Sequence, residues 1–308
     1  GPGGGPLVIQ YGQVLAIAVI LILAVANYYG VKVGGGVQIT TTIAKLGLIA
    51  LVIVIGLFGG SADPANFATS VPARGGLAGF VAALVAALWA YDGWNNLNMV
   101  AGEVKNPQRN LPRALIYGTS LVMAIYLITN LAYFLVLPAS EVAAKDRVAS
   151  EMMRRILGAP GAAAVALAAM LSIFAALNGS ILSGARVPYA MAHDGLFFKA
   201  FGGVNASHHT PGFSILALSG WSCVLVLSGR YEQLLTLVIF PSWILYGMAT
   251  AAVIVLRRKM PDAPRPYRTL GYPVVPVVFV LVAILLLGFT LVNSPRESGL
   301  GLVVIAIG

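Results

Sequence analysis

The feature that most constrains this chain is a series of long apolar runs separated by short polar segments. A helix needs about 20 apolar residues to cross a bilayer, whereas a strand of a membrane barrel needs only about 9–11. Eight runs meet the helical length, and a ninth begins at Leu300. The eight runs cover residues 7–28, 37–59, 76–101, 114–137, 160–185, 211–228, 234–256 and 273–292. We therefore predict an all-α membrane protein with eight full transmembrane helices and part of a ninth, and no soluble domain.

Charge supports this class and orients the chain. Only 9% of the residues are charged, against about a quarter in soluble domains. The net charge of +9 does not indicate a nucleic-acid partner, because the basic residues lie almost entirely between the apolar runs. The odd-numbered connections carry 11 of the 19 basic residues and the even-numbered ones carry 7. The positive-inside bias then places the odd connections in the cytoplasm and residue 1 outside, as expected for a multi-pass protein of a plasma membrane.

The third run contains a polar cluster, "LWAYDGWNNLN", at residues 88–98. Glycine favours interruption of a helix, and Asp and Asn compete for local backbone bonds. We predict that the helix breaks at Asp92-Gly93 and that Asp92 caps a second half-helix starting near Gly93. Broken helices in transporters direct free backbone groups toward substrate and ions. The alternative is a span that ends early, with Asp92 among the headgroups.

Lys45 is the other charge inside an apolar run, about nine residues from its start. A charge at this depth costs about 2.5–3.5 kcal/mol and usually marks a functional position. Lys45 either faces the interior of the helix bundle, as a fixed cation where a related machine binds sodium, or extends its stem toward the headgroups.

Other polar or aromatic residues within the runs are candidates for lining a cavity. Hydroxyl and amide groups lie near one face of "LSIFAALNGSILSGAR", and an aromatic follows Phe240-Pro241. The alternatives are hydrogen bonding between helices for the polar group and ordinary packing for the aromatic. The candidates are Ser172, Asn178, Ser180 and Trp243.

Enzyme chemistry has little support in the sequence. His193, His208 and His209 fall in one predicted cytoplasmic connection, and the adjacent pair has no third ligand at metal spacing. No phosphate-binding or nucleophile motif occurs. The single cysteine, Cys223, lies within a run, so we expect no disulfide-linked subunit. We predict no enzyme activity, no cofactor and no metal.

Four stretches resemble the amino acid–polyamine–organocation superfamily, and most closely its L-type amino acid transporter branch with bacterial relatives. They are "FVAALVAALWAYDGWNNLNMVAGEVKNPQRNLPRAL", "ALNGSILSGARVPYAMAHDG", "ANYYGVKVGGGVQITTTIAKLG" and "RPYRTLGYPVVP". The resemblance implies a leucine-transporter-type fold of two inverted five-helix repeats, without the family's first three helices. It divides a single transmembrane domain, 1–308, into the end of the first repeat (1–59), the second repeat (76–256) and C-terminal helices (273–308), of which the last is truncated.

The same resemblance assigns roles to individual positions. Trp89 falls on the gating aromatic, and Lys45 on a lysine that replaces sodium in sodium-independent members. The implied activity is sodium-independent uptake or exchange of neutral amino acids by alternating access. The implied location is a bacterial inner membrane, with the amino acid and the bilayer as partners. The chain would then hold the amino-group half of the site, lack the carboxylate half, and fail to transport alone. The implied substrate-binding residues are Trp89, Ala90, Tyr91, Asp92, Gly93 and Asn95.

Two other functions remain open at this point. A solute sensor or scaffold with the same fold would bind an amino acid without moving it. A carrier of cationic amino acids or polyamines would use Asp92 to attract an amine, although Lys45 would offset that charge.

Overall fold

The computed structural model describes residues 10–71, 75–228 and 231–307, and this part of the chain contains helices and no strands. Six helical stretches are long and apolar enough to cross a membrane. The multi-pass, all-α prediction is confirmed. The helices within these stretches are α1 (Tyr11–Tyr28), α2 (Val31–Phe58), α5 (Pro107–Val136), α8 (Ala159–Gly184), α11 (Tyr231–Lys259) and α12 (Val274–Asn293).

Three of the nine predicted spans form shorter helices. The third run forms α3 (Gly76–Ala90), and the sixth forms α10 (Gly212–Ser228). The ninth forms α13 (Pro295–Ile307), which begins five residues before the predicted start at Leu300. Proline suits the first turn of a helix because its missing N–H would have had no intrahelical partner there. In the part of the chain that the structure describes, all nine predicted segments are therefore helical, six of them as long stretches and three as shorter helices.

The described chain divides into two compact units. The larger unit contains residues 10–71 and 93–223, and the smaller unit contains residues 75–92 and 224–307. The division into inverted repeats stays a prediction.

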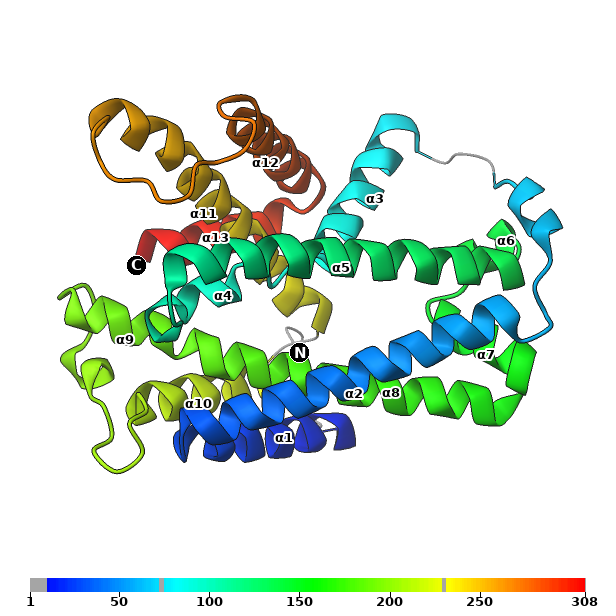
Figure 1. The fold of residues 1–308 in the computed structure, drawn as a ribbon, viewed down its shortest axis with the longest axis horizontal. Helices are drawn as coiled ribbons and strands as arrows, with labels where there is room; N and C mark the ends of the chain where they lie inside the picture. The colour runs from blue at the N-terminus through cyan, green and yellow to red at the C-terminus, as the bar shows by residue number, and fades with distance from the viewer. Residues whose placement is uncertain (1–9, 72–74, 229–230, 308) are drawn as a thin grey trace. The chain divides into compact units, whose positions relative to one another are not determined.

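Within the larger unit, α2 packs along α8 and also contacts α1 and α5 (Figure 1). Gly56 of α2 permits one close approach, because a Cβ there would lie 2.9 Å from the Met152 sulfur and 3.0 Å from the Ala132 Cβ. A small apolar core forms around this contact. Its buried members are Ala132, Val136, Leu137, Met152 and Met153.

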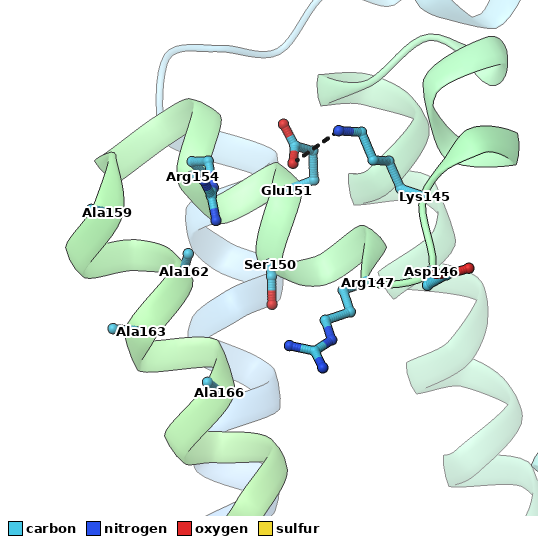
Figure 2. Close-up of a pocket in the computed structure, with 10 residues that line it drawn as sticks. All are labelled: Lys145, Asp146, Arg147, Ser150, Glu151, Arg154, Ala159, Ala162, Ala163 and Ala166. Atoms are coloured by element: carbon cyan, nitrogen blue, oxygen red, sulfur yellow. Dashed lines mark ion pairs between the residues drawn. The ribbon is translucent and has the colours of Figure 1, made fainter.

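The connection at 138–159 contains two helices that the sequence analysis did not predict: α6 (Ala139–Ala144) and α7 (Val148–Leu157). α7 packs against the start of α8 (Figure 2). It is amphipathic: Met152 and Met153 are buried in the core, whereas Arg154 and Arg155 are exposed. Its ten residues are too few and too polar to register as a span.

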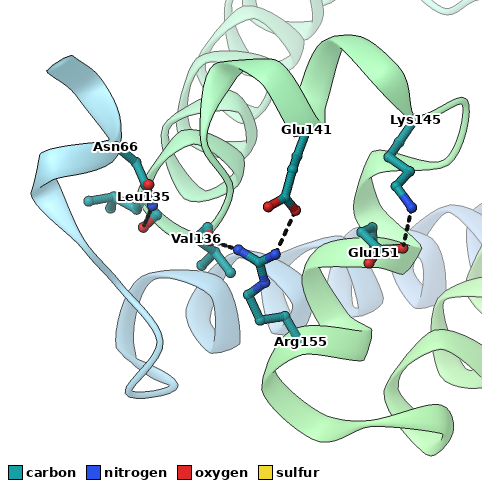
Figure 3. Close-up of polar contacts among 7 residues, drawn as sticks. All are labelled: Asn66, Leu135, Val136, Glu141, Lys145, Glu151 and Arg155. Carbon is teal, nitrogen blue, oxygen red and sulfur yellow. Dashed lines mark hydrogen bonds and ion pairs between the residues drawn. The ribbon is translucent and has the colours of Figure 1, made fainter. Parts of the chain in front are cut away.

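Polar contacts hold two even-numbered connections, 60–75 and 138–159, at this end of the larger unit, where the Ala139 backbone amide donates to the Thr69 hydroxyl at 2.9 Å. The Asn66 amide donates a hydrogen bond of 3.1 Å to the Leu135 carbonyl. Arg155 lies 2.5 Å from a Glu141 oxygen and donates to the Val136 carbonyl at 3.2 Å (Figure 3). The two connections of the larger unit that are predicted to lie outside are therefore together.

Odd-numbered connections of the larger unit meet at the other end of α2, which at 28 residues is about 42 Å long. The Asn205 amide donates to the Tyr28 hydroxyl, and the Thr210 hydroxyl donates to the Tyr28 carbonyl, both at 2.8 Å. Segments that the charge bias assigns to opposite sides of the membrane thus lie at opposite ends of the larger unit.

In the smaller unit, α11 packs against both α12 and α13, and α3 contacts α12. Pro241 lies inside α11, and the Trp243 ring stacks on Phe279 of α12 with 5.9 Å between centroids. Beyond the end of α11, the Arg265 guanidinium donates to the Pro261 and Ala263 carbonyls at 2.8 Å. These bonds order the connection between α11 and α12.

Candidate functional site

The predicted break in the third apolar run is present. α3 ends at Ala90, residues 91–95 form turns, and a four-residue helix, α4 (Asn96–Met99), follows. The Asp92 backbone N–H donates to the Trp89 carbonyl at 3.0 Å, and the Asn96 backbone N–H donates to the Gly93 carbonyl at 3.2 Å. Both bonds join residues three apart, as in tight turns, instead of the four of an α-helix.

Gly93 explains why the chain turns here. Its φ of +103° lies in a region that residues with a Cβ rarely adopt. The boundary between the two compact units also falls between Asp92 and Gly93. The interruption is therefore both a local change of conformation and the point where the chain passes from one unit to the other.

The capping role predicted for Asp92 is wrong. Asn95 occupies the N-cap of α4, with no side-chain capping bond. Helical residues begin only at Asn96, so Asp92 is too far upstream to serve as the N-cap. The Asp92 carboxylate instead accepts a hydrogen bond of 3.1 Å from the Tyr246 hydroxyl of α11.

In the smaller unit, this bond brings two predicted site residues into one group. Tyr246 also lies edge-on to Trp243, with 6.1 Å between ring centroids. Asp92 and Trp243 are thus connected through Tyr246 of α11. Trp89 is half-buried in the last turn of α3, and Ala90 and Asp92 are exposed beside it.

In the larger unit, the chain beyond Gly93 is held by an ion pair that the sequence analysis missed. After α4 comes the short 3-10 helix η2 (Ala101–Glu103). Two Glu103 oxygens accept from Arg186 at 2.8 and 3.3 Å, and Arg186 also donates to the Leu182 carbonyl. Arg186 is only 8% exposed. The only sequence signal was the opposite charge of two residues in connections predicted to share one side of the membrane.

Lys45 lies near the middle of α2 and is half-buried. Within the described part of the chain it forms no ion pair or hydrogen bond. One turn earlier, Gln38 donates to the Thr42 hydroxyl, and Thr41 donates to the Val37 carbonyl. The ammonium therefore sits on a helix that carries polar groups within the span, and its role stays a prediction.

Asn178 is fully buried in a polar network among α1, α2 and α8. Its amide nitrogen donates to the Gly34 carbonyl at 3.1 Å and to the Gln38 oxygen at 2.9 Å. Its oxygen accepts from the Asn27 amide at 2.9 Å. This arrangement favours hydrogen bonding between helices over lining a cavity.

Ser180 lies elsewhere on α8. It lines a pocket of about 190 Å³ between α8 and α10, together with Ser219 and Ser222. The Ser222 hydroxyl donates to the Leu218 carbonyl, whereas the buried Ser219 hydroxyl has no partner among the described atoms. Ser172 is half-buried on α8 and is not among the residues lining this pocket. The pocket therefore joins Ser180 to none of the other candidates.

Metal chemistry finds no support in the described residues, where no three His, Cys, Asp or Glu side chains gather in a metal-binding group. The arrangement provides an interrupted helix, a carboxylate with a tyrosine partner, and aromatic side chains. These groups suit binding of a small polar solute.

Comparison with known proteins matches residues 9–305 to the amino acid permease family. The serine/threonine exchanger SteT of Bacillus subtilis is 34% identical over 295 residues, which cover 95% of this chain and 67% of that protein. The human b(0,+)-type amino acid transporter 1 is 32% identical, with 91% of this chain and 58% of that protein covered. The human cystine/glutamate transporter is 29% identical, with coverage of 98% and 60%. The chain thus spans about three-fifths to two-thirds of the length of these relatives.

Proposed function

The chain belongs to the amino acid permease family, and from this premise we propose that it takes part in carrying amino acids across a bacterial inner membrane by alternating access. The observation that carries the proposal is the interrupted helix at residues 91–95. A continuous helix uses its own backbone groups, whereas an interrupted one frees N–H and C=O groups to bind a zwitterion.

The proposed substrate contacts come from both sides of the interruption. On one side lie Trp89, Ala90, Tyr91 and Asp92, and on the other lie Gly93 and Asn95. Backbone carbonyls at the turn accept hydrogen bonds from the substrate's ammonium group, and the aromatic rings cover its side chain. Asp92 adds a negative charge, and the hydrogen bond that its carboxylate accepts from the Tyr246 hydroxyl weakens its attraction for a substrate cation.

We propose neutral amino acids as substrates and transport without sodium. The name of the Bacillus subtilis relative, a serine/threonine exchanger, supports the first part. The second rests on Lys45, whose ammonium provides a permanent positive charge inside a span. One observation favours a second candidate, a cationic substrate. The Asp92 carboxylate is exposed and belongs to the turn at residues 91–95.

The test is exchange by the protein expressed from its complete gene and reconstituted in liposomes. Labelled serine, leucine, arginine and glutamate are offered outside, with unlabelled amino acid inside, with and without sodium. We expect serine or leucine to exchange at the same rate with and without sodium. Arginine as the preferred substrate would move the assignment to the cationic class. Binding without exchange would indicate a sensor, and neither binding nor exchange would refute the proposal.

A further inference from the structure

The connection at 138–159 carries an unusual amount of positive charge for its predicted position outside the membrane. It holds four basic residues, more than half of the seven in all even-numbered connections. Two of the four are neutralised within the protein. Lys145 lies 3.6 Å from a Glu151 oxygen, and Arg155 lies 2.5 Å from a Glu141 oxygen (Figure 3). The other two basic residues are Arg147 and Arg154.

Both remaining arginines line a pocket of about 540 Å³ between the start of α7 and the start of α8 (Figure 2). Neither forms an ion pair with any residue that the structure describes. The Ser150 hydroxyl projects from the same side of α7 as the Arg147 guanidinium. The pocket therefore contains two guanidinium groups and one hydroxyl, all of which can donate hydrogen bonds to an oxyanion.

The acidic residues of the pocket do not cancel this charge. Glu151 is already paired with Lys145, and the Asp146 carboxylate points away from the Arg147 guanidinium in Figure 2. With three basic and two acidic residues in its lining, the pocket keeps a net positive charge. A phosphate group, which arginine binds with two parallel hydrogen bonds, matches this arrangement.

The opposite wall of the pocket is apolar. Ala159, Ala162, Ala163 and Ala166 follow the spacing of one helical face at the start of α8. The same face continues into the span with Met170 and Ile173, which are 57% and 67% exposed. An apolar helix face thus leads from the cationic groups toward the middle of a membrane-spanning helix.

We propose that this pocket binds the phosphate headgroup of an anionic phospholipid in the outward-facing leaflet, with one acyl chain along the alanine face of α8. The charge complementarity selects the phosphate, and the apolar face of α8 selects a lipid over a free anion. A zwitterionic lipid also carries a phosphate, but its own ammonium group is repelled by the two arginines. This site is separate from the proposed transport activity, and its test needs no transport measurement.

The experiment measures lipid binding to the detergent-solubilised 308-residue chain by native mass spectrometry. Phosphatidylglycerol and phosphatidylcholine are titrated separately, and inorganic phosphate is added as a competitor. We expect at least tenfold tighter binding of phosphatidylglycerol than of phosphatidylcholine. In the double variant Arg147→Gln/Arg154→Gln this preference should fall at least tenfold. Both side chains are exposed, so the thermal midpoint without lipid should stay unchanged.

Two further variants distinguish a lipid site in this pocket from general attraction between the basic protein and an anionic lipid. Arg258→Gln/Arg268→Gln removes the same charge from two exposed positions, one in the last turn of α11 and one in the connection that follows, and should keep the preference. Ala163→Phe places a large side chain in the pocket and should weaken phosphatidylglycerol binding while both arginines remain. The proposal is overturned if the Arg147/Arg154 variant binds phosphatidylglycerol as the unmodified chain does. Displacement of the lipid by equimolar inorganic phosphate would equally overturn it in favour of a free-anion site.

Discussion

The Tyr246 hydroxyl donates a 3.1 Å hydrogen bond to the Asp92 carboxylate, so a residue in the middle of α11 is tied to the turn that follows α3. A hydrogen bond to a charged group is worth about 1.5–3 kcal/mol when the site is shielded from water. Here Asp92 is exposed, so the bond is at the weak end of that range. Its main effect is on how much of the carboxylate's charge is available to a substrate.

Tyr246→Phe removes this hydrogen bond and keeps the ring. Without the hydroxyl donor, the Asp92 carboxylate attracts a cationic side chain more strongly. We therefore expect the affinity for arginine relative to leucine to rise by about fivefold to tenfold. Competition against a labelled amino acid measures the ratio. Tyr267→Phe, at an exposed tyrosine of the same unit, is the control and should leave the ratio alone. An unchanged ratio in Tyr246→Phe would mean that Asp92 does not face the substrate.

Gly93→Ala tests whether the conformation of the turn requires glycine. At φ +103° an alanine costs about 1 kcal/mol or more, although its Cβ would meet nothing closer than the Asn96 amide nitrogen at 3.9 Å. We expect a lower thermal midpoint in detergent. Gly47→Ala in α2 is the matched control: its Cβ enters open space in a helix, so it should be neutral or stabilising. If both variants behaved alike, the strain at Gly93 would not matter for stability.

The sequence predicted the features that depend on local composition. Hydropathy located the long helices to within a few residues at most ends, and Asp92-Gly93 indicated the break. Features that depend on distant partners were missed. Tyr246 is 154 residues from Asp92, and Arg186 is 83 residues from Glu103, so no local pattern connects either pair. α7 was missed because its apolar side is only a few residues long, and Met152 becomes a core residue only where α2 and α5 pack against it.

The Glu103–Arg186 ion pair should be strongly coupled, and the two single substitutions should differ. In Glu103→Gln, the Arg186 guanidinium loses its charge partner while its side chain is only 9% exposed to solvent. In Arg186→Gln, the Glu103 carboxylate loses its partner, but its side chain is 44% exposed and can be solvated by water. We expect Glu103→Gln to lower stability by about 1–3 kcal/mol, and the double variant to lose less than the sum of both. Unfolding measured in a double-mutant cycle provides the coupling energy. Strict additivity would show that the pair does not act as a unit.

Lys45→Ala should impair exchange far more than it impairs insertion. The side chain is half-buried in a span, where its charge is proposed to replace a cation. We expect at least a tenfold loss of exchange by the protein from its complete gene, with membrane yield unchanged. Lys32→Ala, at an exposed lysine near the start of the same helix, should retain exchange. Normal exchange by Lys45→Ala would instead support the alternative in which Lys45 extends its stem toward the headgroups.

Asn178→Ala distinguishes a structural amide from one that binds substrate. The side chain joins α8 to Asn27 of α1 and to Gly34 and Gln38 of α2. Single hydrogen bonds between membrane helices contribute about 0.6 kcal/mol on average, so losing three should cost about 2 kcal/mol. We therefore expect a lower thermal midpoint but an unchanged dissociation constant for the amino acid, each measured in detergent. Ser180→Ala, in the pocket on the other side of α8, should lower the midpoint less. A weaker affinity with an unchanged midpoint would instead place Asn178 in the binding site.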